Sequence, residues 1–228
     1  MSAVRKLYEL AGADPALRFS PYCWRTRLAL AHKGLAVETI PWRFTEKEEI
    51  AFSGQKLVPV LVDGEKTLSD SQAIAEYLEE AYPQAPSLFG GPQAYALMQF
   101  IRRWVDGVLV MSLVRVLVPD IFQLIHPKDK AYFRESREKR LGISIEALAT
   151  QRAEHLKAFE AVLAPLRATL KGQKFISGDD TPLYADHIVF GALQWARKTS
   201  STELWGEDDP VARWMEAVLG YYGDKVQR

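Results

Sequence analysis

Residues 20–34 read Ser-Pro-Tyr-Cys-Trp-Arg-Thr-Arg-Leu-Ala-Leu-Ala-His-Lys-Gly and carry the start and stop signals of one helix. The Ser20 side chain can cap free backbone N–H groups, and Pro21 suits the first helical position because it has no N–H to leave unpaired. Lys33 in the last turn and Gly34 beyond it are typical of a helix end. We expect a short strand at residues 6–10, so the strand, loop and capped helix form a place where an anion or thiolate can bind. Taken alone, the same serine is accounted for by a plain helix cap.

The composition is that of an ordinary soluble globular protein. The chain has 228 residues, of which 48% are hydrophobic and 25% charged, enough for one large or two modest domains. Lys plus Arg equals Asp plus Glu at 29 each, so no charge signature predicts nucleic acid or an anionic membrane as a partner. We expect no signal peptide and no membrane span. Cys23 is the only cysteine, which excludes an intrachain disulfide or a Cys-rich zinc site and favours the reducing cytoplasm.

The first eighty residues alternate strand and helix patterns. Further strands are expected at residues 35–41, 58–62 and 65–68, and further helices at residues 45–52 and 69–81. Thr45 with Glu48, and Ser69 with Gln72, have the spacing of capping boxes for these two helices. Asp63-Gly64 between the last two strands predicts a hairpin. The order is therefore βαβαββα.

Beyond residue 92 only helical patterns recur. Residues 82–92 contain three prolines and two glycines and are typical of a linker. Helices are expected at residues 95–118, 128–140, 145–170, 185–197 and 210–222, with a loop at residues 175–186. Pro119 should end the first of them, and the charged run 128–140 should be a solvated face. We therefore predict an α/β domain over residues 1–82, a linker over 83–92 and an all-α domain over 93–228.

Taken together, these features resemble the cytosolic glutathione transferase superfamily over essentially the whole chain. The Ser20–Thr26 motif, the Trp42–Thr45 loop and the Ala73–Leu78 segment are most similar to the bacterial β-etherase-like branch and its fungal etherase-related, FuA-type relatives. The resemblance implies a thioredoxin-like N-terminal domain and glutathione as the co-substrate, with no metal. It also implies a homodimer that acts in cytoplasmic detoxification on a hydrophobic small molecule.

The resemblance assigns Ser20 to the sulfur of glutathione. A free thiol has a pKa of about 8.5 and is mostly protonated at neutral pH. A hydroxyl donor and a helix N-terminus both stabilise the thiolate, which is the nucleophile. We therefore expect Ser20 to be the catalytic residue.

Four further residues are expected to hold the peptide part of glutathione. Val58-Pro59 resembles the family's cis-proline turn, whose backbone pairs with the cysteinyl part; the alternative is an edge strand with a trans proline. Asp70-Ser71 resembles the pair that holds the γ-glutamyl end; the alternative is that both only cap a helix.

The glycine carboxylate of glutathione requires a cation, and Arg43 and Lys56 are the candidates. The family commonly has a basic or amide residue immediately before Val-Pro, whereas this chain has Leu57. The sequence leaves open which cation serves.

Cys23 occupies the second cysteine position of a glutaredoxin-like Cys-Pro-Tyr-Cys motif whose first position is Ser20 here. Two sulfurs are needed for dithiol chemistry, so it is excluded within one chain. Cys23 is predicted to be a buried packing residue, with a monothiol role as the alternative.

Asp186 resembles the family's capping aspartate in the helical domain, although Leu183 replaces the usual Ser, Thr or Asn three residues earlier. This region is interpreted as structural. The four histidines lack ligand spacing, and none is expected to bind metal: His32, His126, His155 and His187.

The second substrate is expected between the domains, against the helix at residues 95–118. Tyr22, Trp42, Trp104 and Val108 are the candidate wall residues, although aromatic side chains at helical spacing can equally be core. The leading hypothesis is a transferase for electrophilic or aryl-ether substrates. The alternatives are a glutathione-dependent peroxidase or thiol reductase, and a ligand-binding protein without turnover.

Overall fold

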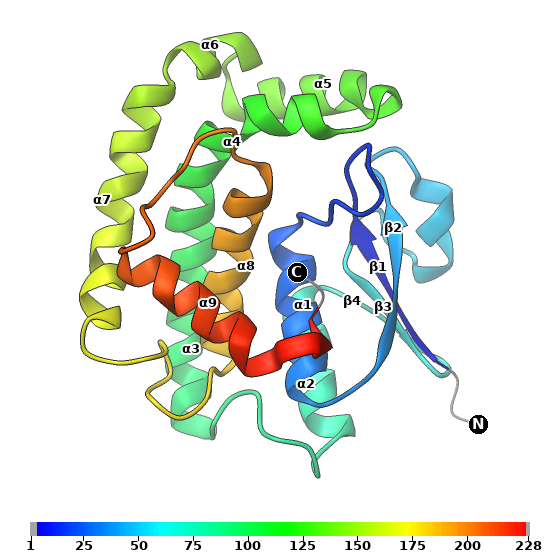
Figure 1. The fold of residues 1–228 in the computed structure, drawn as a ribbon. Coiled ribbons are helices and arrows are strands. Elements are labelled where there is room, and N and C mark those ends of the chain that lie inside the picture. Colours follow the sequence, from blue (N-terminus) through cyan, green and yellow to red (C-terminus); the bar gives the residue numbers. More distant parts are fainter. Residues whose placement is uncertain (1–3, 227–228) are drawn as a thin grey trace.

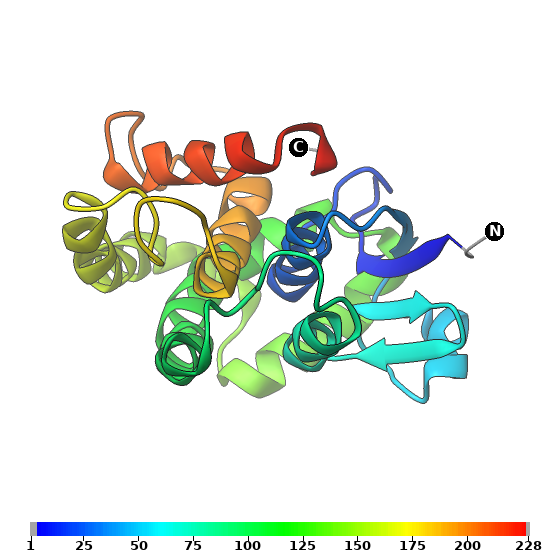
Figure 2. The ribbon, with the colours of Figure 1, turned by 90° about the horizontal axis from the view of Figure 1, so that it is seen from below.

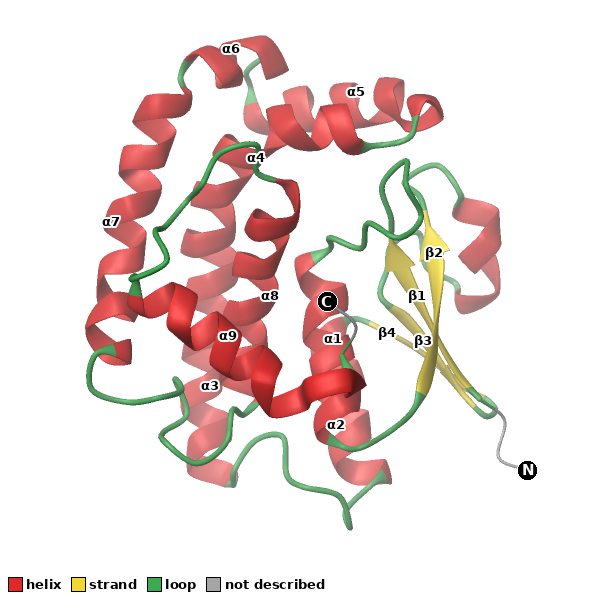
Figure 3. Ribbon diagram, viewed as in Figure 1, coloured by secondary structure: helices red, strands yellow, loops and turns green. Residues whose placement is uncertain are grey.

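A four-stranded mixed sheet forms the N-terminal half of the protein, in a computed structural model that describes residues 4–226. Its strands are β1 (Arg5–Leu10), β2 (Val37–Trp42), β3 (Val60–Asp63) and β4 (Lys66–Ser69). They lie in the order β2-β1-β3-β4, with β2 parallel to β1 and the other pairs antiparallel. Figure 3 shows all four strands together at one side of the molecule, with helices making up the rest. This is the predicted thioredoxin-like arrangement.

Helix α1 (Pro21–His32) is the element on which the two halves meet. It lies between the sheet and the helical half, beside α2 (Ser71–Ala81), while a short 3-10 helix (Lys47–Ser53) lies on the outer side of the sheet (Figures 1 and 2). Eleven of its twelve residues are buried, Tyr22 being the exception. A helix that is buried all round needs apolar or paired side chains on every face. Arg25 and Arg27 satisfy this need through ion pairs with Asp106 and Glu9.

The C-terminal half is helical. Its helices are α3 (Pro92–Trp104), α4 (Val110–Leu124), α5 (Lys130–Leu141), α6 (Ile145–Thr150), α7 (Arg152–Leu170), α8 (Tyr184–Thr199) and α9 (Pro210–Tyr222). Short 3-10 helices are at Pro127–Asp129 and Gly223–Lys225. Helix α8 packs directly on α1, and α4 lies behind it (Figure 1). Within residues 4–226, no helix combines the length and apolar character that crossing a bilayer requires.

Two of the predicted helix boundaries are wrong. Pro119 lies inside α4, which follows α3 through a π turn at Val105–Leu109 and runs on to Leu124. A proline inside a helix costs about 3 kcal/mol, but the buried side chains on both sides of Pro119 favour continuation. The single helix expected at residues 145–170 is two, because the chain turns at Gln151 and α7 takes a new direction (Figure 1).

Both capping boxes predicted in the N-terminal half are also wrong. The Thr45 hydroxyl donates to Asp129 Oδ1 over 2.6 Å instead of capping a helix, and the 3-10 helix begins only at Lys47. Helix α2 begins at Ser71, one residue after its true cap, Asp70. Asp70 Oδ1 accepts the N–H groups of residues 72 and 73 over 2.9 and 3.0 Å.

A cluster of two histidines and a tyrosine joins the two halves at the C-terminal end of α1. The Tyr222 hydroxyl lies 3.0 Å from His32 Nδ1 and also bonds His187 Nε2. The other ring nitrogen of His32 lies 2.9 Å from the Ser87 carbonyl. Burial lowers the pKa of His187 well below its ordinary value, and burial likewise lowers the pKa of His32. Both rings are therefore neutral in the folded protein at neutral pH.

The buried histidines predict that stability falls as the pH falls below about 6.5. The unfolded chain then binds protons that the folded chain refuses, so His187 removes at most about 1.4 kcal/mol of folding free energy between pH 7.5 and 5.5, and His32 removes a part of that amount. Urea unfolding at these two pH values should show this loss of stability. In His187→Gln the loss should be smaller, because the contribution of His187 is absent. Equal pH dependence in wild type and His187→Gln would contradict the prediction.

Candidate functional site

Ser20 lies at the N-terminus of α1, as its sequence context predicted. Its backbone is extended (φ −60°, ψ 127°), and its Oγ accepts the Cys23 N–H over 3.3 Å. An oxygen that accepts one hydrogen bond still carries its own hydrogen to donate. The residue is 4% exposed.

Ser20 lines a cavity of about 270 Å³ between the sheet half and the helical half. On the sheet side the wall includes Tyr22, Trp42 and Val58. On the helical side α4 contributes four apolar residues: Val110, Val114, Val118 and Ile121. Larger hollows exist, but one lies around the loop after α8, far along the chain from Ser20. The cavity at Ser20 combines an apolar wall with a capped helix start.

The peptide bond between Val58 and Pro59 is cis, immediately before β3. This places Val58 on the cavity wall at the end of a central strand, not on an edge strand. Asp70 and Ser71 lie at the start of α2. Asp70 has a positive φ of 70°, uncommon for a residue other than glycine and often found at functional sites. The Ser71 carbonyl accepts the Tyr184 hydroxyl over 2.7 Å, which ties this helix start to α8.

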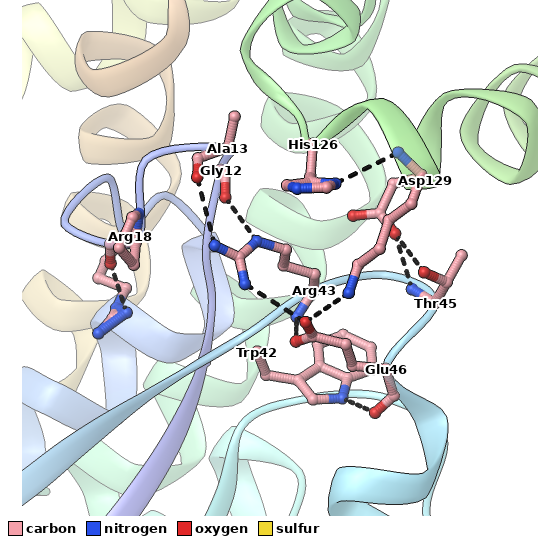
Figure 4. A network of polar contacts seen from close by, with 11 residues as sticks. Gly12, Ala13, Arg18, Trp42, Arg43, Thr45, Glu46, His126 and Asp129 are labelled. Carbon is pink, nitrogen blue, oxygen red and sulfur yellow. Dashed lines mark hydrogen bonds and ion pairs between the residues drawn. The ribbon is translucent and has the colours of Figure 1, made fainter.

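The structure does not bring Arg43 to the cavity. Its guanidinium donates to the carbonyls of Gly12 and Ala13 over 3.2 Å and forms an ion pair with Glu46 at 3.3 Å (Figure 4). Glu46 also accepts a hydrogen bond from the Arg43 backbone N–H. These contacts hold the loop between β2 and the 3-10 helix in place. Each of the three guanidinium nitrogens of Arg43 therefore makes a bond within this loop region.

Lys56 is exposed. Lys47, which lies against the Lys56 backbone, was not among the cations expected from the sequence. The Lys47 ammonium donates to the Lys56 carbonyl over 2.7 Å and lies 4.6 Å from the centre of the Trp42 ring. Burial lowers the pKa of Lys47. Lys47 thus lies against Trp42, a residue of the cavity wall, and against the backbone of the segment that precedes Val58.

Trp104 and Val108 are not part of the cavity wall, whereas Tyr22 and Trp42 are. Val108 lies in the π turn and is 44% exposed. Instead, α5 closes the cavity with Phe133, Arg137 and Arg140. The spacing of Phe133 and Arg137, one helical turn apart inside a charged run, is the signal that this face of the helix is not simply solvated.

Cys23 is a buried packing residue, as predicted. It is 1% exposed, and burial, with the charge of Glu9, raises the pKa of its thiol to about 12. A thiol in this state is a poor nucleophile. Within residues 4–226, no group of three or more His, Cys, Asp or Glu side chains has an arrangement that could hold a metal ion.

Gly191 in α8 allows the close approach that fixes the N-terminus of α1. A Cβ at this position would lie 2.3 Å from the Pro21 carbonyl oxygen and 3.1 Å from Arg25 Cγ. The first distance is shorter than any real contact and involves backbone, so the helices would have to separate. The position of Ser20 therefore depends on a glycine 171 residues later in the chain.

Gly191→Ala is accordingly expected to lower the free energy of unfolding by about 3 kcal/mol. Urea unfolding measures the loss. Gly220→Ala is the matched control because Gly220 lies in α9 with no atom within 4 Å of the added Cβ. That variant should gain about 1 kcal/mol from better helix propensity. A Gly191→Ala protein as stable as wild type would show that α1 and α8 can move apart at little cost.

The fold and the site define a thioredoxin-like protein with a second, helical domain that closes an apolar cavity over a capped helix start. Residues 15–86 match the family model "Glutathione S-transferase, N-terminal domain", and residues 96–224 match "Glutathione S-transferase, C-terminal domain". The chain belongs to the glutathione S-transferase family.

Among curated relatives, the glutathione S-transferase-like protein ustS of Aspergillus flavus is 28% identical over 151 residues, 61% of this chain and 54% of that protein. A zeta-class glutathione S-transferase of Euphorbia esula is 44% identical over 70 residues, 28% of this chain and 31% of that protein. The matched stretch thus spans about half or less of these two relatives.

Solved structures match over the whole chain. Glutathione transferase GSTFuA3 of Phanerochaete chrysosporium has a TM-score of 0.87 at 23% identity and covers 100% of both chains. CsGST63524 of Ceriporiopsis subvermispora, solved with glutathione, has a TM-score of 0.83 at 23% identity, covering 99% of this chain and 98% of that one. These likenesses concern the fold, and they include the FuA-type transferases that the sequence motifs resemble.

Proposed function

We propose that the protein is a glutathione transferase in which Ser20 donates a hydrogen bond to the sulfur of glutathione and stabilises its thiolate. The observation that supports this most directly is the position of the Ser20 hydroxyl. It lies at a helix N-terminus and on the wall of the apolar cavity. The helix N-terminus and the hydroxyl donor favour a negatively charged sulfur there, while the apolar wall suits a hydrophobic second substrate.

The rest of glutathione then extends along the end of the sheet. The backbone of Val58, before cis-Pro59, pairs with the cysteinyl part, and Asp70 and Ser71 hold the γ-glutamyl end. For the glycine carboxylate we favour Lys56 together with Lys47, because the Arg43 guanidinium is already bonded to Glu46 and two carbonyls.

The second substrate is a hydrophobic electrophile with an aromatic group, bound against Tyr22, Trp42 and α4. In the proposed step, the thiolate forms an S–C bond to a carbon beside an aryl ether oxygen, the C–O bond breaks, and the electron pair leaves with the phenolate. The mainly apolar wall and the modest volume of the cavity suit one such aryl group. We further propose that the protein works as a cytoplasmic homodimer in detoxification.

The decisive experiment is the ultraviolet difference absorbance of glutathione mixed with wild type and with Ser20→Ala, scanned across pH. A thiolate band that persists in wild type well below the free-thiol pKa, and disappears in the variant, is the expected result. Glutathione that binds without any such band would remove the catalytic role of Ser20.

One observation supports the alternative of a ligand-binding protein without turnover. The bond from the Cys23 N–H to Ser20 Oγ is also what a plain helix cap makes. Glutathione affinity without activity toward several electrophile classes would favour this alternative. The buried Cys23 thiol, with its raised pKa, gives no comparable support to a thiol reductase.

A further inference from the structure

Two arginines of α5 bring uncompensated positive charge to the cavity wall. Arg137 is half-buried, with its guanidinium carbon 4.6 Å from the centre of the Phe133 ring and 5.3 Å from that of Phe44. Its hydrogen bond goes to the Ser136 hydroxyl over 3.0 Å. Arg140 is exposed at the mouth, where it contacts the Met111 sulfur at 3.6 Å. Within residues 4–226, neither arginine forms an ion pair with a carboxylate, and the cavity wall contains no Asp or Glu.

Three other arginines that are withdrawn from water have anionic partners, whereas within residues 4–226 the half-buried Arg18 and Arg102 have no carboxylate partner. Arg25 pairs with Asp106 at 2.7 Å, Arg152 with Asp120 at 2.7 Å, and Arg5 with Asp63 at 3.1 Å. Removing a cation from water is costly unless an anion accompanies it. Burial lowers the pKa of Arg137, and Arg140 adds to this effect. Arg137 therefore lacks the counter-charge that Arg25, Arg152 and Arg5 have, and its neighbour Arg140 adds a second positive charge to the cavity wall.

We propose that Arg137 and Arg140 bind an anionic group, a carboxylate or a sulfonate, on the aromatic second substrate. This rests on the proposed function and narrows its substrate class from apolar electrophiles to electrophiles with a negatively charged arm. The aromatic part lies against the valines of α4, and its anionic arm reaches the α5 end of the cavity. A planar guanidinium held on aromatic rings is preorganised to hold a carboxylate through two parallel hydrogen bonds.

The glycine carboxylate of glutathione is the other anion that can approach this region. Both arginines line the cavity, whereas Lys47 and Lys56 do not, although the Lys47 ammonium lies 5.2 Å from the centre of the Tyr132 ring of α5. We therefore assign the arginines to the second substrate, and the test separates the two anions.

The binding test uses two dyes with one aromatic framework, 8-anilino-1-naphthalenesulfonate and the neutral N-phenyl-1-naphthylamine. Fluorescence titration of wild type should give a sulfonate affinity roughly tenfold higher than that of the neutral dye. Arg137→Gln and Arg140→Gln should each remove most of that preference while leaving the neutral dye unaffected. Arg137→Lys should restore part of it if the Gln variant folds poorly. Lys139→Gln, an equal charge change on an exposed residue of the same helix, is the matched control.

Three results would overturn the proposal. The first is equal affinity of wild type for the two dyes, and the second is a preference that survives in the double variant. The third is that the arginine variants bind glutathione more weakly, bind γ-glutamylcysteine as wild type does, and keep the preference for the sulfonate dye. That outcome would assign the arginines to the glycine carboxylate instead.

A comparison of two substrates, one anionic and one neutral, tests the anion site separately from the transferase activity. Glutathione should react with 4-(chloromethyl)benzoate and with its neutral methyl ester, forming an S–C bond and releasing chloride. The ratio of the two kcat/KM values should favour the anion in wild type and fall roughly tenfold in Arg140→Gln. If both compounds react and the ratio of their kcat/KM values is the same in Arg140→Gln as in wild type, the anion site is contradicted and the transferase proposal is not. Turnover of neither contradicts the transferase proposal, while the dye titration still decides the anion site.

Discussion

At pH values below 7, replacing Ser20 with alanine is expected to lower kcat/KM for glutathione transfer by about 100-fold. Removing one positioned hydrogen-bond donor from an anion in an active site typically has an effect of this size. Without the hydroxyl, the bound thiol should approach its free pKa of about 8.5. The rates of variant and wild type should therefore converge as the pH rises above 9. A full pH profile of kcat/KM with a neutral electrophile measures this convergence.

Two variants make the Ser20 result specific. Ser20→Thr keeps a hydroxyl and a good helix cap, so it should retain most of the activity at neutral pH. Cys23→Ala removes the neighbouring sulfur, which is buried and has a raised pKa, and should leave the pH profile unchanged. Loss of the helix cap costs about 1 kcal/mol in Ser20→Ala, which urea unfolding records separately. A profile for Ser20→Ala that runs parallel to wild type at all pH values would exclude thiolate stabilisation by this hydroxyl.

Asp186→Ala is expected to lower the free energy of unfolding by about 4 kcal/mol, the upper range for a single substitution. The Asp186 carboxylate is fully buried. It accepts four N–H groups at 2.7 to 3.2 Å, those of Ile176, Ser177, Leu183 and the Trp214 indole. Alanine would remove the acceptor of four charge-assisted hydrogen bonds and leave the Trp214 indole N–H buried without a partner.

Urea unfolding of Asp186→Ala and two companions tests this prediction. Asp186→Asn keeps the shape but replaces one acceptor oxygen by a donor, so its loss should be smaller than that of alanine and still above 1 kcal/mol. Asp179→Ala is the matched control, because Asp179 lies in the same loop and accepts one exposed N–H, that of Lys174, over 2.8 Å. If the alanine variant does not fold, the asparagine variant decides. A loss below about 1 kcal/mol in Asp186→Asn would show that water or loop movement replaces the acceptor.

The structural role of Asp186 explains how a leucine can occupy the cap position before α8. The Leu183 side chain cannot accept a hydrogen bond, so only half of a capping box exists there. Its backbone N–H donates to Asp186 over 3.2 Å, and the remaining donors come from the preceding loop and from α9. Asp186 thus holds together the preceding loop, the start of α8 and α9. The sequence around Asp186 does not indicate the contact with α9.

Elements whose signals are local can be placed from the sequence. Pro21, Lys33 and Gly34 mark the start and end of α1, and Asp63-Gly64 joins β3 to β4. Helix α9 has the predicted bounds, Pro210–Tyr222. Caps, turns and hydrophobic periodicity act within a few residues, so a single sequence displays them directly.

Tertiary structure alone decided the features that depend on partners distant in the chain. Thr45 bonds Asp129 instead of capping a helix, and Arg43 is taken up by Glu46 and the loop after β1. Gly191 sets how closely α8 approaches α1, and the turn at Gln151 separates α6 from α7. A side chain bonds whichever group packing brings near it, and that neighbour is fixed only when the whole chain has folded. For the same reason Arg137, one residue in a charged run, lies on the wall of the cavity.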